Sequence, residues 1–103
     1  MNPPFITEKN MNHPSSAKFP LGQTVGTPGA LEVLHPEDLS RSLQRHAQGD
    51  WGDCGEEDRQ ENELSLQEGF RLFSVYHDRN GTKFWIITEA DRSATTILLP
   101  EDY

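Results

Sequence analysis

The hydrophobic residues in the last third of the chain are mostly aromatic or β-branched, which is typical of β-strands. Aromatic and β-branched residues are concentrated in 70–78, 82–89 and 94–99, and polar turn residues separate these three segments. Asn80-Gly81, between the first two, is a strong hairpin signal because both residue types tolerate a positive φ. The pattern therefore predicts a three-stranded antiparallel β-meander.

A two-residue turn at Asn80-Gly81 fixes which side chains of the first hairpin share a face. It places Tyr76 opposite Trp85 and Val75 opposite Ile86. One predicted face then holds Phe73, Val75, His77, Phe84, Ile86 and Thr88, and the other holds Leu72, Ser74, Tyr76, Trp85 and Ile87. Both faces carry apolar groups, so we expect helices on one face and the N-terminal segment over part of the other.

Two helices are predicted before the strands, over 28–34 and 37–48. Thr27 suits the N-cap of the first, and Pro28 suits its first position, where the missing N–H costs nothing. In the second, apolar residues recur every four positions and give one apolar face. Arg41, Arg45 and His46 fall toward its last turns, where positive charges are favoured.

A third helix is predicted over 55–68. Asp53 followed by Glu56 resembles a capping box that starts it, and Gly69 is expected to end it. Its only apolar residues are two leucines, so we expect it to be largely solvated.

These elements predict one α+β domain over 18–103, with helices packed on the meander. Residues 1–17 are rich in proline, asparagine and serine, and we predict a disordered tail there. The run 19–25 is expected to add a short extended edge segment to the domain.

Nearly all of the net charge of -8 lies in residues 50–69. This segment has eight acidic residues and one basic residue, Arg59, which is a net charge of -7. Such a segment repels a nucleic-acid duplex or an anionic membrane and attracts a basic protein surface. We therefore predict a non-enzymatic protein-interaction module for a basic protein partner, without direct nucleic-acid or membrane binding. DNA mimicry is a sharper form of this hypothesis. The predicted partner-binding residues are Trp51, Glu56, Glu57, Asp58, Glu61 and Glu63.

The stretch GDWGDCGEED at 49–58 also partly matches a calcium-binding loop. Counting from Asp50, Gly55 falls at position 6 and Glu61 at position 12, as in an EF-hand. Positions 3 and 5, however, carry glycine and cysteine, which supply no side-chain oxygen. We interpret the stretch as a connector and predict no metal and no cofactor.

Trp51 and Cys54 each have a structural and a functional interpretation. A tryptophan exposes too much apolar area to be left in solvent, so Trp51 is expected to pin the connector to the core, with a binding hot spot as the alternative. Cys54 is the only cysteine, and the acids around it are expected to raise its pKa, which favours an inert thiol.

A different function is suggested by the polar turn at 88–93. Glu89, Asp91 and Arg92 form an alternative site, that of a small metal-dependent or acid–base enzyme. The other interpretation is ordinary turn chemistry, for which aspartate and serine are common residues.

The sequence also bears on location. It has no apolar run of the ~20 residues that a membrane span needs and no apolar centre of a signal peptide near its start. We therefore expect a cytoplasmic protein, and a monomer is slightly favoured.

Four motifs resemble a known family. They are FPLGQTV at 19–25, TPGAL at 27–31, GDWGD at 49–53 and GTKFWIITEADRSATTILLPEDY at 81–103. They are similar to short bacterial proteins carried on plasmids and integrated mobile elements, which bear labels such as plasmid-related protein or type I restriction subunit. Cys54-Gly55 departs from the bulky apolar residue expected after GDWGD. The resemblance implies no catalytic residues, and the chain lacks the glycine loop and methyltransferase motif of a restriction subunit.

Overall fold

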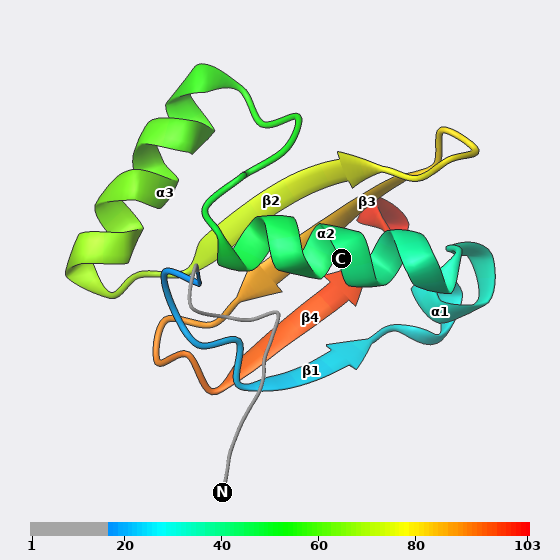
Figure 1. The fold of residues 1–103 in the computed structure, drawn as a ribbon, viewed down its shortest axis with the longest axis horizontal. Coiled ribbons are helices and arrows are strands. Elements are labelled where there is room, and N and C mark those ends of the chain that lie inside the picture. Colours follow the sequence, from blue (N-terminus) through cyan, green and yellow to red (C-terminus); the bar gives the residue numbers. More distant parts are fainter. Residues whose placement is uncertain (1–16) are drawn as a thin grey trace, which may run out of the picture.

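The computed structural model describes residues 17–103, so the predicted tail of residues 1–17 lies almost entirely outside the described residues. The fold is α+β, as predicted, with helices packed against one sheet (Figure 1). The elements are β1 (Gln23–Gly26), α1 (Pro28–Val33), α2 (Pro36–Ala47), α3 (Glu56–Glu68), β2 (Leu72–His77), β3 (Lys83–Thr88), β4 (Ala94–Leu98) and the 3-10 helix η2 (Pro100–Asp102). The three predicted helices and the three C-terminal strands are confirmed to within two residues at each end.

The predicted three-stranded meander is wrong in its strand count. The sheet has four strands in the order β1-β4-β3-β2, and β1 pairs in parallel with β4, so the sheet is mixed. β1 has only four residues, and three of them are exposed, so it carries no alternating pattern. The pairing of β1 with β4 requires a glycine at position 22, because a Cβ there would lie 2.4 Å from the carbonyl oxygen of Ser93.

The predicted register of the β2–β3 hairpin is also wrong, by one residue. Tyr76 pairs with Phe84 and Val75 pairs with Trp85. The loop has three residues, 79–81, and its last residue, Gly81, has a φ of +82°. Such a loop combines a type I turn with a left-handed glycine.

Asp78 selects the longer loop. One of its carboxylate oxygens accepts the N–H groups of Asn80 and Thr82, both at 2.9 Å. Because side chains alternate along a strand, this shift of one residue exchanges the faces of β3 relative to β2. One face therefore carries Leu72, Ser74, Tyr76, Phe84, Ile86 and Thr88, all of which are buried, and Trp85 lies on the other face.

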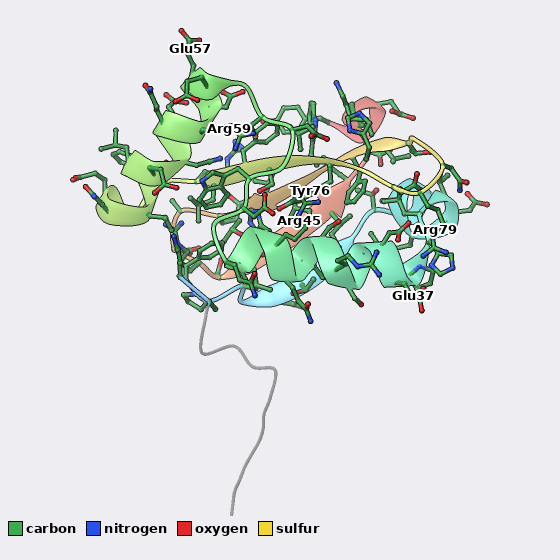
Figure 2. The ribbon with its side chains drawn as sticks, turned by 45° about the horizontal axis from the view of Figure 1, so that its top comes forward. Glu37, Arg45, Glu57, Arg59, Tyr76 and Arg79 are labelled. Carbon is green, nitrogen blue, oxygen red and sulfur yellow. The ribbon has the colours of Figure 1, made fainter. Side chains whose placement is uncertain are left out.

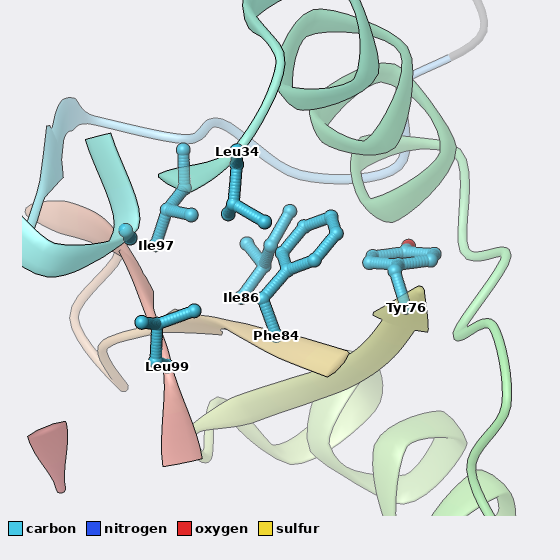
Figure 3. Close-up of a cluster of buried hydrophobic side chains, with 7 residues drawn as sticks. Leu34, Tyr76, Phe84, Ile86, Ile97 and Leu99 are labelled. Carbon is cyan, nitrogen blue, oxygen red and sulfur yellow. The ribbon is translucent and has the colours of Figure 1, made fainter. Parts of the chain in front are cut away.

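The main core fills the space between this buried face and helices α1 and α2, which cover it (Figures 1 and 3). The core consists of Ala30, Leu34, Tyr76, Phe84, Ile86, Ile97 and Leu99. Leu39 and Leu43 pack against it, which confirms the apolar face predicted for α2. Each large apolar side chain buried here contributes about 1.5–3 kcal/mol, so this cluster is the main source of stability.

The helix ends follow local signals with one exception. The Thr27 hydroxyl accepts the N–H of Ala30 at 3.2 Å, and Gly69 ends α3 with a φ of +79°, as predicted. The predicted capping box is wrong: the N-cap of α3 is Gly55, which makes no side-chain bond. Asp53 instead lies 2.8 Å from Nδ1 of His77, because the chain before α3 runs beside β2.

Candidate functional site

The connector between α2 and α3, residues 48–55, is anchored by Trp51. This side chain is 2% exposed and belongs to a second apolar cluster with Phe19, Cys54 and Leu72. Its indole N–H donates to Oε2 of Glu63 at 2.8 Å. The interpretation of Trp51 as a core anchor is therefore confirmed. A contact between Trp51 and a partner would require the ring to leave this cluster.

The backbone of the connector lies along the outer edge of β2. The N–H of Val75 donates to the carbonyl of Trp51 at 3.2 Å, and the N–H of Asp53 donates to the carbonyl of Val75 at 2.7 Å. Figure 2 shows Arg45 next to Tyr76, with its guanidinium 4.8 Å from the ring centroid. These contacts fix the position from which α3 starts.

A single side chain of α3 continues the pairing along the same edge. Asn62 is 3% exposed, and its carboxamide accepts the N–H of Phe73 at 3.0 Å and donates to the Phe73 carbonyl at 2.7 Å. It satisfies both backbone groups of that residue, as a neighbouring strand would. α3 is thus held to β2 by polar contacts, which explains how a helix with so few apolar residues is fixed in place.

Replacing Asn62 with alanine should lower the free energy of unfolding by about 1–3 kcal/mol, because the N–H of Phe73 loses its partner and the Phe73 carbonyl keeps only the Cys54 thiol, at 3.4 Å. Urea denaturation measures this loss, and hydrogen exchange should show faster exchange at the Phe73 amide. The exposed Gln60 on the same helix is a control, and its replacement by alanine should cost less than about 0.5 kcal/mol. Equal losses for the two variants would contradict the role of Asn62.

The predicted acidic partner residues lie together on the exposed side of α3. All five of them, Glu56, Glu57, Asp58, Glu61 and Glu63, are exposed. Two of them make side-chain contacts within the described chain: Glu63 accepts from Trp51, and Glu56 accepts from Gln60 at 3.2 Å. Across residues 17–103, no ion pair involves Glu57, Asp58 or Glu61.

The one basic residue of this segment, Arg59, does not neutralise the acidic side of the helix. Its Nη2 donates to the carbonyl of Gly52 at 2.8 Å. In Figure 2, Glu57 points away from the rest of the fold, whereas Arg59 points toward the connector. The outward surface of α3 therefore carries negative charge that the described part of the chain leaves uncompensated.

A groove of about 380 Å³ lies between α3 and the sheet face opposite α2, and we call it the α3 groove. Its floor consists of Phe73, Trp85 and Ile87. One wall consists of Asp58, Glu61, Asn62 and Ser65, and the other of Arg71 and Tyr103. The Trp85 ring lies edge-on to both Phe73 and Tyr103, with centroid distances of 5.1 and 5.7 Å.

Two of the predicted partner residues, Asp58 and Glu61, line this groove, but its aromatic floor was not predicted as part of a site. The sequence-based register placed Trp85 on the face of Tyr76, whereas the observed register puts it on the face of Phe73. If a three-residue loop at 79–81 had been predicted, Trp85 and Phe73 would have been placed on the same face of the sheet.

The alternative site residues, Glu89, Asp91 and Arg92, all belong to the β3–β4 turn. The Arg92 guanidinium donates to the carbonyls of Phe70 at 2.7 Å and Ser65 at 3.0 Å. Asp91 accepts the N–H of Ser93 at 3.0 Å, and hydrogen bonds from Ser93 lower the pKa of its carboxyl. Arg92 thus ties the end of α3 to the turn. The enzyme alternative stays a prediction.

A buried polar chain, which the sequence did not reveal, joins α2 to the sheet through His46. Thr95 donates its hydroxyl proton to the Leu21 carbonyl at 2.7 Å, which leaves its oxygen to accept from Thr88 at 2.7 Å. Thr88 then accepts from Nε2–H of His46 at 2.9 Å, and Nδ1 of His46 accepts from Ser74 at 2.6 Å. With the imidazole protonated at Nε2, every side chain in this series of hydrogen bonds has a partner.

His46 is therefore not a cation at the end of α2, although its position in the last turn favours a positive charge. It has 0% exposure, and burial, with a smaller contribution from Arg92, lowers its pKa to about 3. The imidazole is neutral at physiological pH. Because Ser74 is also 0% exposed, this Ser–His pair has no access for a substrate.

Two further groups have shifted pKa values with structural causes. Hydrogen bonds from Arg79 lower the pKa of Asp38 to about 2 and join α2 to the β2–β3 loop. Burial raises the pKa of the Cys54 thiol, and this effect is larger than that of the neighbouring acids. Burial therefore opposes formation of a thiolate at Cys54.

No family model, curated protein or solved structure matches this chain. The resemblance to the mobile-element proteins stays a prediction. Over residues 17–103, no three His, Cys, Asp or Glu side chains are grouped so that they could hold a metal ion. α3 begins at Glu56, so residues 50–61 do not form one calcium-binding loop. None of the helices in this part of the chain is both long and apolar enough to span a bilayer.

Proposed function

We propose that this protein is a non-enzymatic interaction module that binds a basic protein through the outward surface of α3. The observation that carries this proposal is the uncompensated charge of Glu57, Asp58 and Glu61, since the only base of the segment, Arg59, is bonded to the connector. Electrostatic complementarity of this kind speeds association and selects partners of opposite charge.

Two further features of α3 support the proposal. The helix is held in place by Asn62 and Arg92, so a partner meets a preorganised surface and loses less entropy on binding. Leu64 is 51% exposed and lines a shallow depression together with Glu57, Asp58, Gln60 and Glu61. An apolar contact surrounded by polar groups is the usual anatomy of a protein interface.

A capture experiment with charge-matched variants tests the proposal. Changing Glu57→Gln, Asp58→Asn and Glu61→Gln together should reduce capture of a partner from the native host by about tenfold or more, because all three charges contribute to the attraction. Glu63 is left unchanged because it bonds to Trp51. Capture should also weaken as the salt concentration rises.

The matched control removes three exposed acids that lie away from α3, with the changes Glu32→Gln, Glu89→Gln and Glu101→Gln. It alters the net charge equally and should retain capture, whereas an equal loss in both triple variants would show that net charge, not α3, matters. Melting temperatures of both variants confirm that they fold. If neither variant loses capture, the proposal is overturned.

DNA mimicry is the sharper version, in which α3 occupies the DNA-binding site of a nuclease or regulator. A duplex added to the captured complex should then displace the protein, because both ligands compete for one site. A partner that binds the duplex and this protein together would exclude mimicry and leave the broader proposal standing.

A further inference from the structure

We infer that the α3 groove binds the guanidinium group of an arginine side chain that the partner presents. This inference rests on the proposed function, and it names the residue type that the partner would insert. The groove is distinct from the outward surface of α3, although Asp58 and Glu61 border both.

The lining of the groove combines two features that together favour a cation. The carboxylates of Asp58 and Glu61 lie on one wall, and the rings of Trp85 and Tyr103 lie on the floor and the other wall. Carboxylates attract a cation directly, and the face of an indole or phenol ring attracts it through the ring quadrupole. An anionic or purely apolar ligand would leave the two carboxylates desolvated without a partner.

Arg71 lies on the opposite wall and carries the one positive charge of the lining. Its Nη1 and Nη2 are both 3.4 Å from the Tyr103 hydroxyl, a long contact, and the described chain pairs it with neither Asp58 nor Glu61. Two negative charges therefore face one positive charge, and a cationic ligand is still attracted. The position of Arg71 also shows that a guanidinium is sterically compatible with the rim.

The shape and the acceptors of the groove favour arginine over lysine. A guanidinium is planar, stacks on aromatic rings, is more weakly hydrated than an ammonium, and presents five N–H donors in a fixed geometry. Ser65 lines the groove with 6% exposure, and across residues 17–103 its hydroxyl makes no hydrogen bond. This hydroxyl is a further acceptor on the helix wall, in addition to the two carboxylates. The groove volume of about 380 Å³ holds such a group with part of its methylene chain and water.

The test uses three blocked amino acids as probes: N-acetylarginine amide, N-acetyllysine amide and N-acetylcitrulline amide. Two-dimensional NMR of the full chain follows the indole N–H of Trp85 and the carboxamide of Asn62, which report on the floor and the wall. We expect saturable shifts confined to the groove with arginine, binding about threefold or more weaker with lysine, and no saturation with citrulline, which is isosteric but uncharged. Equal binding of all three probes, or arginine shifts elsewhere, would overturn the inference.

Variants separate the contributions of charge and ring. Asp58→Asn with Glu61→Gln should weaken arginine binding by about tenfold, whereas Glu32→Gln with Glu68→Gln, which changes the charge equally outside the groove, should leave it unchanged. Trp85→Leu should remove the preference for arginine over lysine. Retained arginine binding in the Asp58/Glu61 variant would sink the inference. If arginine does not bind but the α3 triple variant still loses its partner, the inference fails and the proposed function stands.

Discussion

Replacing Gly52 with alanine should lower the free energy of unfolding by about 3–5 kcal/mol, because two effects add: a left-handed backbone and a steric clash. Gly52 has a φ of +74°, and a Cβ there would lie 2.0 Å from the carbonyl oxygen of Val75. That oxygen accepts the N–H of Asp53 at 2.7 Å, so relief of the clash must separate the connector from β2. Urea denaturation followed by circular dichroism measures the loss.

Gly69 provides a matched control that separates the two effects. Its φ is +79°, but no atom lies within 4 Å of a Cβ built there. Gly69→Ala should therefore cost only about 1–2 kcal/mol, which is the cost of the left-handed conformation. If Gly52→Ala costs no more than Gly69→Ala, the connector is not held rigidly against β2, and the preorganised position of α3 loses one of its supports.

The parts of the fold that the sequence predicted are those with local causes. Thr27 caps α1 with its own hydroxyl, and Gly69 ends α3 by adopting a conformation that other residues resist. The runs of aromatic and β-branched residues locate β2, β3 and β4 to within two residues. Each of these signals depends only on neighbours in the chain, and a single sequence contains all of them.

The hairpin register depends on whether the loop has two or three residues, and Asn80-Gly81 is compatible with both. Asn-Gly suits a two-residue turn, but glycine in the left-handed region also suits a three-residue loop. The carboxylate of Asp78 decides between them, because it binds two N–H groups of the longer loop. This one-residue difference moved Trp85 to the face of Phe73, so the α3 groove was hidden from the sequence although each of its strands was predicted.

The position of α3 could not be predicted, since it depends on contacts between distant residues. Hydrophobic periodicity finds helices that bury an apolar face, whereas α3 packs only Leu66 against an apolar cluster. Its other contacts are polar: Asn62 bonds to the edge of β2, and Arg92 of the β3–β4 turn bonds to Ser65 in the last turn of α3.

The charge of residues 50–69 was visible, and so was its imbalance. The contact between Arg59 and the Gly52 carbonyl could not be predicted from the sequence. It turns the only base of the segment toward the connector and away from the outward acids.

Acidification from pH 6.5 to 4.5 should lower the free energy of unfolding by about 2 kcal/mol through His46 alone, with a slope that approaches about 1.4 kcal/mol for each pH unit toward the lower end of this range. In the folded chain, burial lowers the pKa of this imidazole from 6.5 to about 3. Below pH 6.5 the unfolded chain therefore binds a proton that the folded chain excludes, and acid favours unfolding. The contribution is fully present above pH 6.5 and is lost progressively down to about pH 3.

The variant His46→Gln separates this effect from the titration of other groups. A glutamine can donate to Thr88 and accept from Ser74, as the imidazole does, but it does not titrate. It should be less stable than the wild type at pH 7.5, because its shape differs, yet its stability should fall less steeply between pH 6.5 and 4.5. Asp38 does not contribute in this window, since its pKa changes from 3.8 to about 2 on folding, so its effect lies at lower pH. Urea denaturation at four or five pH values gives both slopes. Equal slopes would mean that His46 takes up its proton in the folded protein. The hydrogen bonds that link Ser74, His46, Thr88, Thr95 and Leu21 would then break without unfolding of the domain.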